Sequence, residues 1–199
     1  MAEREIGGDV AQQISLALQF VKENLSFKSY INKEGRRVEE YEIPLDALRE
    51  AIVNAVCHRD YSIPSPIYLK IFDDRVEVIN PGKLPYPLTP EKLKSEHQSI
   101  LRNPKIANVL FLYGFIERWG TGTNKIVESC IRHGLKEPDF VEEGNFFKVV
   151  FYRKKLNLME AKVLKLCSKK VTSSVIANKL GISERTARKY LKELVRKGM

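Results

Sequence analysis

The sequence predicts an α+β fold, arranged as a layered α/β sandwich and followed by a small all-α unit. Helical and strand-like patterns are mixed up to about residue 152, whereas the patterns that follow are helical. The chain has 199 residues, 43% of them hydrophobic and 30% charged, which suffices for one large domain or two small ones. We therefore expect a first domain over residues 1–152 and a second over 153–199.

The first third of the chain combines two helices with a pair of strands. Apolar residues recur at helical spacing after Asp9, whose side chain suits the position before a helix. Two β-rich segments flank a turn that ends at Gly35, and Pro44 then permits a new helix to begin. The expected elements are a helix over 9–25, strands over 27–31 and 38–43, and a helix from about 45 to 60.

The middle of the chain adds a hairpin, a long loop, two helices and a closing strand. Four prolines interrupt the segment from Pro81 to Ser99, and a loop of that length inside a domain is typical of a lid or binding loop. Asn103 and Pro104 form a helix start, in which asparagine caps and proline takes the first helical position. The expected elements are strands at 67–71 and 76–78, helices from 103 and from about 121 to 134, and a strand over 145–152.

Residues 153–199 show three helical patterns and nearly all the excess positive charge. From Tyr152 to Met199 there are 14 basic and 3 acidic residues, which gives this quarter a net charge of +11. Because the whole chain has a net charge of +9, the remainder carries −2. The second and third helices are separated by the turn at Gly181, and Ser183 can cap the third. This pattern predicts a helix-turn-helix that binds nucleic acid. A helical bundle that serves dimerisation is the alternative.

The third helix of this unit should present basic side chains to DNA. In a helix-turn-helix, residues near the start of the recognition helix contact bases, and neighbouring lysines and arginines contact phosphates. The inward residues are expected to be Ala187, Leu191, Leu194 and Val195. The expected DNA-binding residues are Arg185, Thr186, Arg188, Lys189 and Lys192. The unit is similar to winged-helix regulators, and we expect the chain to stop short of the wing.

Composition argues against several other classes of protein. No apolar run approaches the roughly 20 residues that span a bilayer, and the first residues lack the pattern of a signal peptide. The cysteines Cys57, Cys130 and Cys167 are far apart and odd in number, which favours neither a disulfide framework nor a zinc site. We expect a cytoplasmic protein without a membrane partner.

The helix expected to end near Asp60 has a polar side that could form a site. At about 100° per residue, Glu50, Asn54 and His58 align along one face. The opposite face holds Leu48, Ile52, Ala55 and Val56. A carboxylate, an amide and an imidazole in a row can approach a metal ion and a phosphate together, although a solvated polar face would have the same pattern.

Four motifs follow one another along the chain. The stretch E-A-x-x-N-A-x-x-H-R-D-Y runs from Glu50 to Tyr61, and N-P-G-x-L-P begins at Asn80. R-N-P begins at Arg102, and E-x-x-G-x-G runs from Glu117 to Gly122. In this order the motifs resemble those of the GHKL superfamily of gyrase, heat-shock chaperone, histidine kinase and mismatch-repair ATPases. In particular, the chain resembles a divergent branch, the ATPase-like domain of transcriptional regulators related to the C-terminal part of RecG-type helicases. The likeness covers about residues 10–152.

This resemblance implies a GHKL-like site for ATP and Mg²⁺. The residue matching the metal ligand is Asn54, and the residue matching the general base is Glu50. The other implied nucleotide-binding residues are His58, Asn80, Gly82, Arg102, Gly120, Thr121, Gly122 and Thr123. The superfamily usually places an aspartate under the adenine amino group, whereas this chain has Asn80 in the corresponding run.

The sequence thus favours a nucleotide-binding transcriptional regulator with a helix-turn-helix, in which ATP and Mg²⁺ order a lid over 81–99 and 102–119. Its partners would be ATP and DNA, and a homodimer would suit a palindromic DNA site. Two alternatives stay open: a DNA-binding regulator whose ATPase-like domain serves assembly without nucleotide, and a weak ATPase in DNA processing. Helicase activity is disfavoured because the sequence lacks a G-x-x-x-x-G-K-[ST] phosphate loop.

Overall fold

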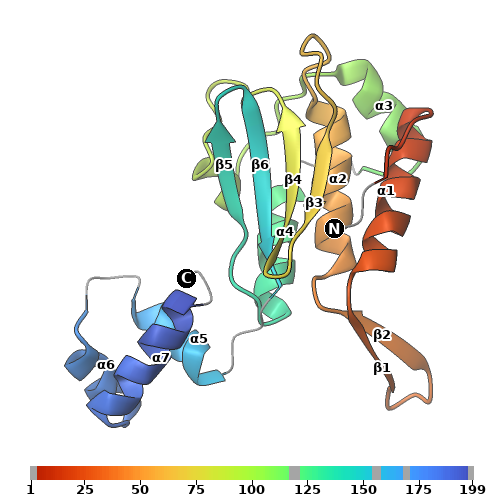
Figure 1. Cartoon of the computed structure of the whole chain (residues 1–199). Coiled ribbons are helices and arrows are strands. Elements are labelled where there is room, and N and C mark those ends of the chain that lie inside the picture. The colour runs from red at the N-terminus through yellow and green to blue at the C-terminus, as the bar shows by residue number, and fades with distance from the viewer. Residues whose placement is uncertain (1–3, 117–121, 154–157, 168–170, 197–199) are drawn as a thin grey trace.

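The computed structural model describes residues 4–116, 122–153, 158–167 and 171–196, which form seven α-helices and six strands. Helices α1 and α2 and strands β1 to β4 come first, as in Figure 1. Their bounds are α1 Val10–Asn24, β1 Phe27–Ile31, β2 Arg37–Tyr41, α2 Leu45–His58, β3 Tyr68–Ile71 and β4 Arg75–Pro81. A 3-10 turn η1 (Lys92–Lys94) precedes α3 Pro104–Leu112, α4 Gly122–Arg132, β5 Asp139–Glu143, β6 Phe146–Tyr152, α5 Leu158–Leu166, α6 Ser173–Leu180 and α7 Glu184–Arg196.

Four strands form an antiparallel sheet in the order β3-β4-β6-β5. The inner face of this sheet carries Val76 and Val78 of β4 opposite Phe151 and Val149 of β6. In Figure 1 the sheet forms one layer and α2 with α4 lies behind it, while α1 packs on α2. The α+β prediction is confirmed.

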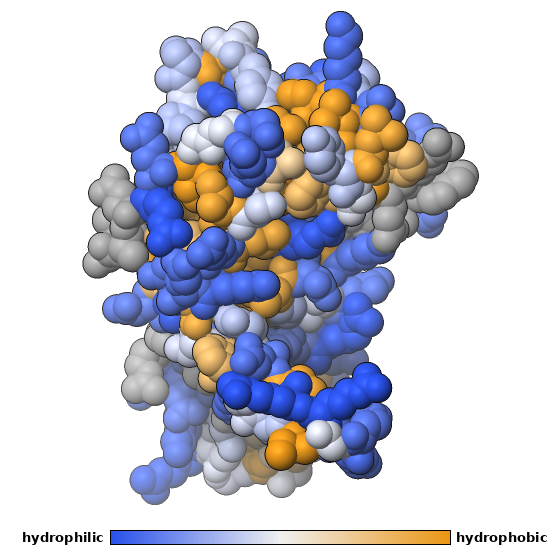
Figure 2. Space-filling model, turned by 90° about the vertical axis from the view of Figure 1, so that its right-hand side faces the viewer, coloured by the Kyte–Doolittle hydropathy of each residue, from blue (hydrophilic) through white to orange (hydrophobic). Residues whose placement is uncertain are grey.

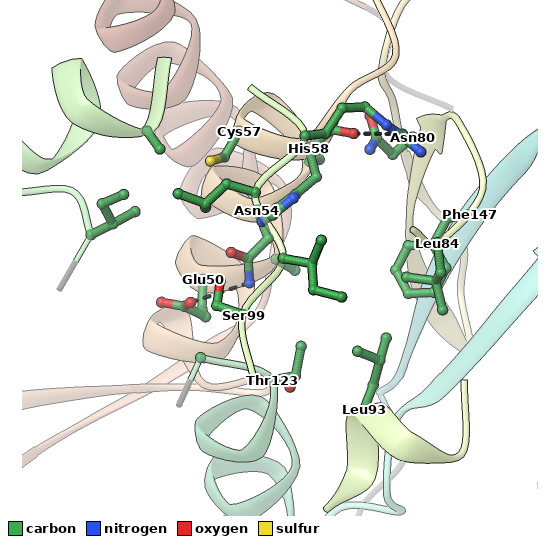
Figure 3. A pocket seen from close by; sticks show the side chains of 18 of the residues that line it. Glu50, Asn54, Cys57, His58, Asn80, Leu84, Leu93, Ser99, Thr123 and Phe147 are labelled. Atoms are coloured by element: carbon green, nitrogen blue, oxygen red, sulfur yellow. Dashed lines mark hydrogen bonds between the residues drawn. The ribbon is translucent and has the colours of Figure 1, made fainter. Parts of the chain in front are cut away.

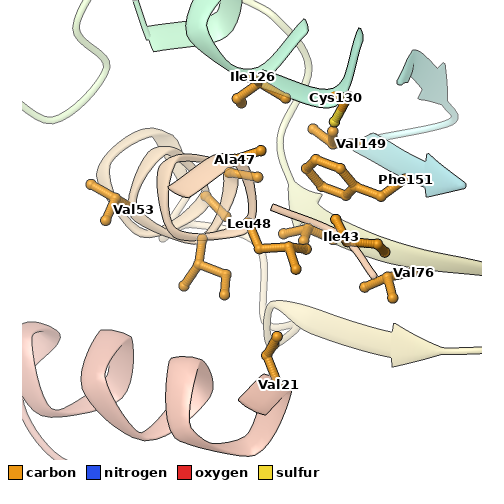
Figure 4. Close-up of a cluster of buried hydrophobic side chains, with 14 of the residues drawn as sticks. Val21, Ile43, Ala47, Leu48, Val53, Val76, Ile126, Cys130, Val149 and Phe151 are labelled. Atoms are coloured by element: carbon orange, nitrogen blue, oxygen red, sulfur yellow. The ribbon is translucent and has the colours of Figure 1, made fainter. Parts of the chain in front are cut away.

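Helix α2 lies at the centre of the core. The predicted apolar residues Leu48, Ile52, Ala55 and Val56 are buried. Ala51, Val53 and Cys57 are buried as well, because α1, α3, α4 and β4 all pack against α2. Figure 4 shows Leu48 and Ala47 of α2 among Ile126 of α4 and Phe151 of β6. The helix therefore has one narrow polar strip rather than a solvated half.

The helix starts follow the sequence in part. Asp9 caps α1 as expected: its side chain accepts a hydrogen bond from the Gln12 backbone nitrogen at 2.9 Å, and the Gln12 side chain accepts one from the Asp9 nitrogen. Asn103 occupies the N-cap position of α3 and Pro104 begins the helix, as predicted, but the Asn103 side chain makes no capping hydrogen bond to α3. Strand β5 was not predicted, because it has only one buried apolar residue, Phe140, and three of its five residues are acidic.

Helices α5, α6 and α7 pack around a second cluster of buried side chains. This cluster holds Val163, Ile176, Ala177, Ala187 and Leu194. The turn after α6 passes through Gly181 at φ +63°, and Ser183 accepts a hydrogen bond from the Thr186 nitrogen at 3.1 Å, as expected of a cap. Val195 was expected to face inward, but it is 73% exposed because it follows the buried Leu194 by one residue.

The surface shown in Figure 2 is mostly hydrophilic, with hydrophobic residues gathered in its upper half. Among the exposed hydrophobic residues, Val109, Leu112 and Tyr113 lie on or just after α3. Within the described part of the chain, no helix has the length and hydropathy needed to cross a membrane.

Candidate functional site

A cavity of about 710 Å³ opens between the polar strip of α2 and the inner face of the sheet. It collects side chains from segments far apart in the sequence: α2, the end of β4, the loop that follows it, and the start of α4. The lining includes the predicted site residues Glu50, Asn54, His58, Asn80, Gly82, Arg102, Gly122 and Thr123. Gly120 and Thr121 lie outside the described residues.

The α2 side of the cavity presents a carboxylate and an amide that are bonded to each other. The Asn54 side-chain nitrogen donates to Glu50 Oε1 at 3.1 Å, as drawn in Figure 3. This bond orients Asn54 and directs its amide oxygen away from the carboxylate, as a cation ligand requires. Within the described chain no group of three His, Cys, Asp or Glu residues could hold a metal ion. A Mg²⁺ ion here would therefore depend on ligand phosphate oxygens and water as well as on Asn54.

His58 and Cys57 have pKa values displaced from their ordinary ranges. Burial lowers the pKa of His58, and the charge of Arg102 lowers it further, which favours the neutral imidazole. Burial, helped by the Glu50 carboxylate, raises the pKa of Cys57 to about 11. Cys57 lines the cavity, and its raised pKa favours the thiol over the nucleophilic thiolate.

At the opposite wall, Asn80 is 5% exposed and its side-chain oxygen is buried without a hydrogen bond to any described residue. Two residues on, Gly82 has φ +112°, and a Cβ there would lie 2.8 Å from Asp60 Cβ and overlap the Arg102 guanidinium. Glycine is therefore required at this turn for both its conformation and its space.

Gly122 brings the N-terminal end of α4 against Glu50. A Cβ on Gly122 would overlap the Glu50 carboxylate and lie 3.4 Å from the Asn54 side-chain nitrogen. Because this residue has no side chain, the free backbone N–H groups of the first helical turn can approach the polar strip of α2. Such a helix start favours bound anions. Thr123 adds a hydroxyl at the same end of the cavity.

Arg102 and Asn103 cap the C-terminal end of α2. Arg102 donates to the backbone oxygen of His58 at 2.9 Å and to that of Lys83. The Asn103 amide donates to the oxygens of Cys57 at 2.9 Å and Arg59 at 2.8 Å. The two side chains thus satisfy three consecutive carbonyls at the end of α2. Arg102 was expected to bind phosphate; it lines the cavity, but one of its donors bonds the end of α2 and another bonds the Lys83 carbonyl.

Replacement of Asn103 by alanine should therefore destabilise the fold. Two backbone carbonyls would lose their donor, and an unsatisfied buried acceptor costs about 1–3 kcal/mol. We expect the free energy of unfolding in urea to fall by about that amount in Asn103→Ala. The exposed neighbour Lys105 is the control, and Lys105→Ala should change stability by less than about 0.5 kcal/mol. Equal stabilities for Asn103→Ala and the wild type would contradict the cap.

Among the cavity residues that were not predicted from the sequence are His97 and Phe147. His97, in the loop after η1, has its Nε2 3.4 Å from the Thr123 hydroxyl and its Nδ1 2.8 Å from the Ser95 carbonyl. Phe147 of β6 lies directly opposite Asn80 of β4. The composition of residues 81–99 predicted a loop, but it did not indicate that His97 faces the cavity. The pattern around Phe147 predicted a strand, but it did not indicate which side of the strand lines a site. The loop is anchored by the buried Leu93 and by the Lys94–Glu137 ion pair at 2.9 Å.

A second, shallow depression lies on α7. It is lined by Glu184, Arg185, Arg188, Lys189, Lys192 and Glu193, which include four of the five predicted DNA-binding residues. Thr186 instead bonds Ser183, with their side-chain oxygens 2.8 Å apart. Arg188 pairs with Glu184 at 2.6 Å in an exposed ion pair, so its charge is partly balanced.

Comparison with known proteins agrees with this architecture. Residues 65–151 match the family model described as "Putative ATP-dependent DNA helicase recG C-terminal". This part of the chain is therefore similar to an ATPase-like domain related to the C-terminal part of RecG. The matched segment includes Asn80, Gly82, Arg102, Gly122 and Thr123, whereas Glu50, Asn54 and His58 precede it.

One similar solved structure is that of the DIP2311 protein from Corynebacterium diphtheriae. The two structures share a TM-score of 0.64 at 23% sequence identity, over 91% of this chain and 41% of that one. The chain thus spans less than half the length of that protein, and the likeness concerns the fold alone. No curated protein matches the chain.

Proposed function

We propose that this chain is a nucleotide-binding, DNA-binding transcriptional regulator, whose cavity binds ATP with Mg²⁺ and whose helix α7 binds DNA. The observation that carries the nucleotide part is the cavity, where the α2 strip, the Asn80–Gly82 turn and the start of α4 converge. A volume of about 710 Å³ is in the range of small-molecule and cofactor sites. The match to an ATPase-like family supports the same ligand.

The two ends of the cavity suit the two ends of a nucleotide. Asn80, Phe147 and Leu84 form a largely apolar wall with one amide, which suits a base. Asn54, Thr123 and the backbone of the α4 start form the polar end, which suits phosphates. Bound Mg²⁺ would offset the phosphate charge there, with Asn54 as its protein ligand.

Titration of the purified chain with ATP, with and without Mg²⁺, tests this proposal. We expect calorimetric binding that depends on Mg²⁺, because the residues at the polar end of the cavity include Glu50, whose carboxylate would repel bare phosphates. Absence of binding under both conditions would refute the nucleotide proposal. That result would favour the alternative in which the ATPase-like domain serves assembly.

Glu50 is the proposed general base for any hydrolysis. Its carboxylate lies against the start of α4 and is held by Asn54, so it can orient a water and accept its proton. Glu50→Gln keeps the shape and the hydrogen bond but removes the basic oxygen. We expect this variant to keep ATP affinity within about threefold and to lose turnover by about 100-fold or more in a phosphate-release assay. Equal turnover by Glu50→Gln and the wild type would exclude Glu50 as the base. The ATP affinity of the variant is compared with that of the wild type.

The DNA part of the proposal rests on charge and on helix packing. The basic residues that line the α7 depression coincide with the quarter of the chain that carries +11. Two separate buried clusters support a division near residue 153 into an ATPase-like domain and a helix-turn-helix. Residues 154–157, between β6 and α5, lie outside the described chain.

A further inference from the structure

The carboxamide of Asn80 is buried, and no described residue fixes its orientation. The residue is 5% exposed, its oxygen has no partner, and its side chain makes no hydrogen bond with the described part of the chain. Buried amides are normally held by hydrogen bonds, because an unpaired polar atom away from water is unfavourable. A ligand in the cavity would supply the missing partner.

The surroundings of this amide suit a flat, uncharged ring. Phe147 is the cross-strand neighbour of Asn80, and its ring stacks on that of Phe140 with centroids 6.2 Å apart. Leu84 and Leu93 line the same side of the cavity. Figure 3 shows Asn80, Leu84 and Phe147 across the cavity from Glu50 and Asn54. One amide in an apolar wall is the pattern expected where a heterocyclic base is bound through its polar edge.

An amide can complement two opposite patterns of donors and acceptors. Its oxygen accepts and its nitrogen donates, whereas an ionised carboxylate only accepts. Rotation by 180° about the terminal torsion exchanges the two atoms with almost no change of shape. Adenine presents a 6-amino donor beside the N1 acceptor, and hypoxanthine presents a 6-oxo acceptor beside an N1–H donor. Because the described residues of this protein lock neither rotamer, each base can select the one it needs.

We infer that Asn80 makes the cavity a site for both 6-amino and 6-oxo purine nucleotides. This inference rests on the proposed nucleotide function and specifies the class of base. ATP and ITP are the matched probes, because inosine differs from adenosine at the N1–C6 edge alone. In calorimetric titrations of the whole chain with Mg²⁺, the two dissociation constants should agree within about tenfold. Binding of ATP with ITP more than about tenfold weaker would overturn the inference while leaving the proposed function intact.

The variant Asn80→Asp tests whether the Asn80 side chain itself contacts the base. A carboxylate still accepts from the 6-amino group of adenine or from N1–H of hypoxanthine, but it cannot donate to adenine N1 or to the 6-oxo group. Each base therefore loses one contact, and the affinities for ATP and for ITP should both fall roughly ten- to a hundredfold. The control is Asn124→Asp on α4. Asn124 also has a buried oxygen without a partner among the described residues, but it does not line the cavity. This control should leave the affinities for ATP and ITP unchanged.

The possible results separate three claims: that Asn80 contacts the base, that both kinds of purine bind, and that the cavity binds nucleotides at all. Unchanged affinities for ATP and ITP in folded Asn80→Asp, checked by circular dichroism, would show that Asn80 does not contact the base. If that variant does not fold, the wild-type ratio of ATP to ITP affinity still tests the inference, because it needs no substitution. Failure of both nucleotides to bind the wild type would overturn the proposed function and this inference together.

Discussion

Asn54→Ala should abolish Mg²⁺-dependent ATP binding while the fold remains intact. The residue is the proposed protein ligand of the ion, and its orientation is set by the hydrogen bond to Glu50. Loss of groups that merely support a metal ligand already costs about 10–100-fold in affinity, so loss of the ligand itself should cost about 100-fold or more. Calorimetric titration at saturating Mg²⁺ measures this change.

The matched control for this substitution is Asn24→Ala at the end of α1. Asn24 donates to the Phe20 carbonyl at 2.8 Å and does not line the cavity. We expect this control to bind ATP as the wild type does. Without Mg²⁺, Asn54→Ala and the wild type should bind equally weakly. An unchanged affinity of Asn54→Ala in the presence of Mg²⁺ would refute the assignment of the metal ligand.

DNA binding by the whole chain should weaken steeply as salt rises, with a slope of about 0.9 log units per log unit of salt for each phosphate contact. The double variant Arg188→Ala/Lys192→Ala should weaken binding and reduce the slope by up to about 1.8. The reduction is an upper value because Arg188 already pairs with Glu184. Fluorescence anisotropy with a labelled duplex at several salt concentrations measures both quantities.

A control with the same loss of charge is Lys28→Ala/Lys33→Ala, on the exposed β1–β2 hairpin. If binding arises from α7, this control should keep the wild-type slope, whereas a general charge effect would lower both slopes equally.

Arg185 and Thr186 lie nearer the start of α7, where base contacts are expected. Their replacement should relax sequence preference by about 1–3 kcal/mol per lost contact. No binding at low salt would leave α5–α7 as an assembly module.

The sequence alone determined the elements whose pattern is local. The capped helix α1, the hairpin of β3 and β4, and helices α5–α7 were predicted from periodicity, Asp9, Gly181 and Ser183, because capping and turn conformation depend on residues a few positions apart. The polar strip of α2 was predicted in the same way. Its place in a cavity with Asn80, Gly82 and Gly122 agrees with the resemblance, although the ligand roles stay predictions.

Only the tertiary structure shows which residues far apart in the sequence contact one another. Arg102 and Asn103 cap α2, more than 40 residues away in the sequence, and this could not be foreseen from their position before α3. Strand β5 has too few apolar residues to predict, and it forms because β6 supplies its hydrogen bonds. His97 and Phe147 face the cavity because of the path of a loop and the register of two strands. Backbone hydrogen bonding and close packing between distant segments fix such positions, so a local sequence pattern does not predict them.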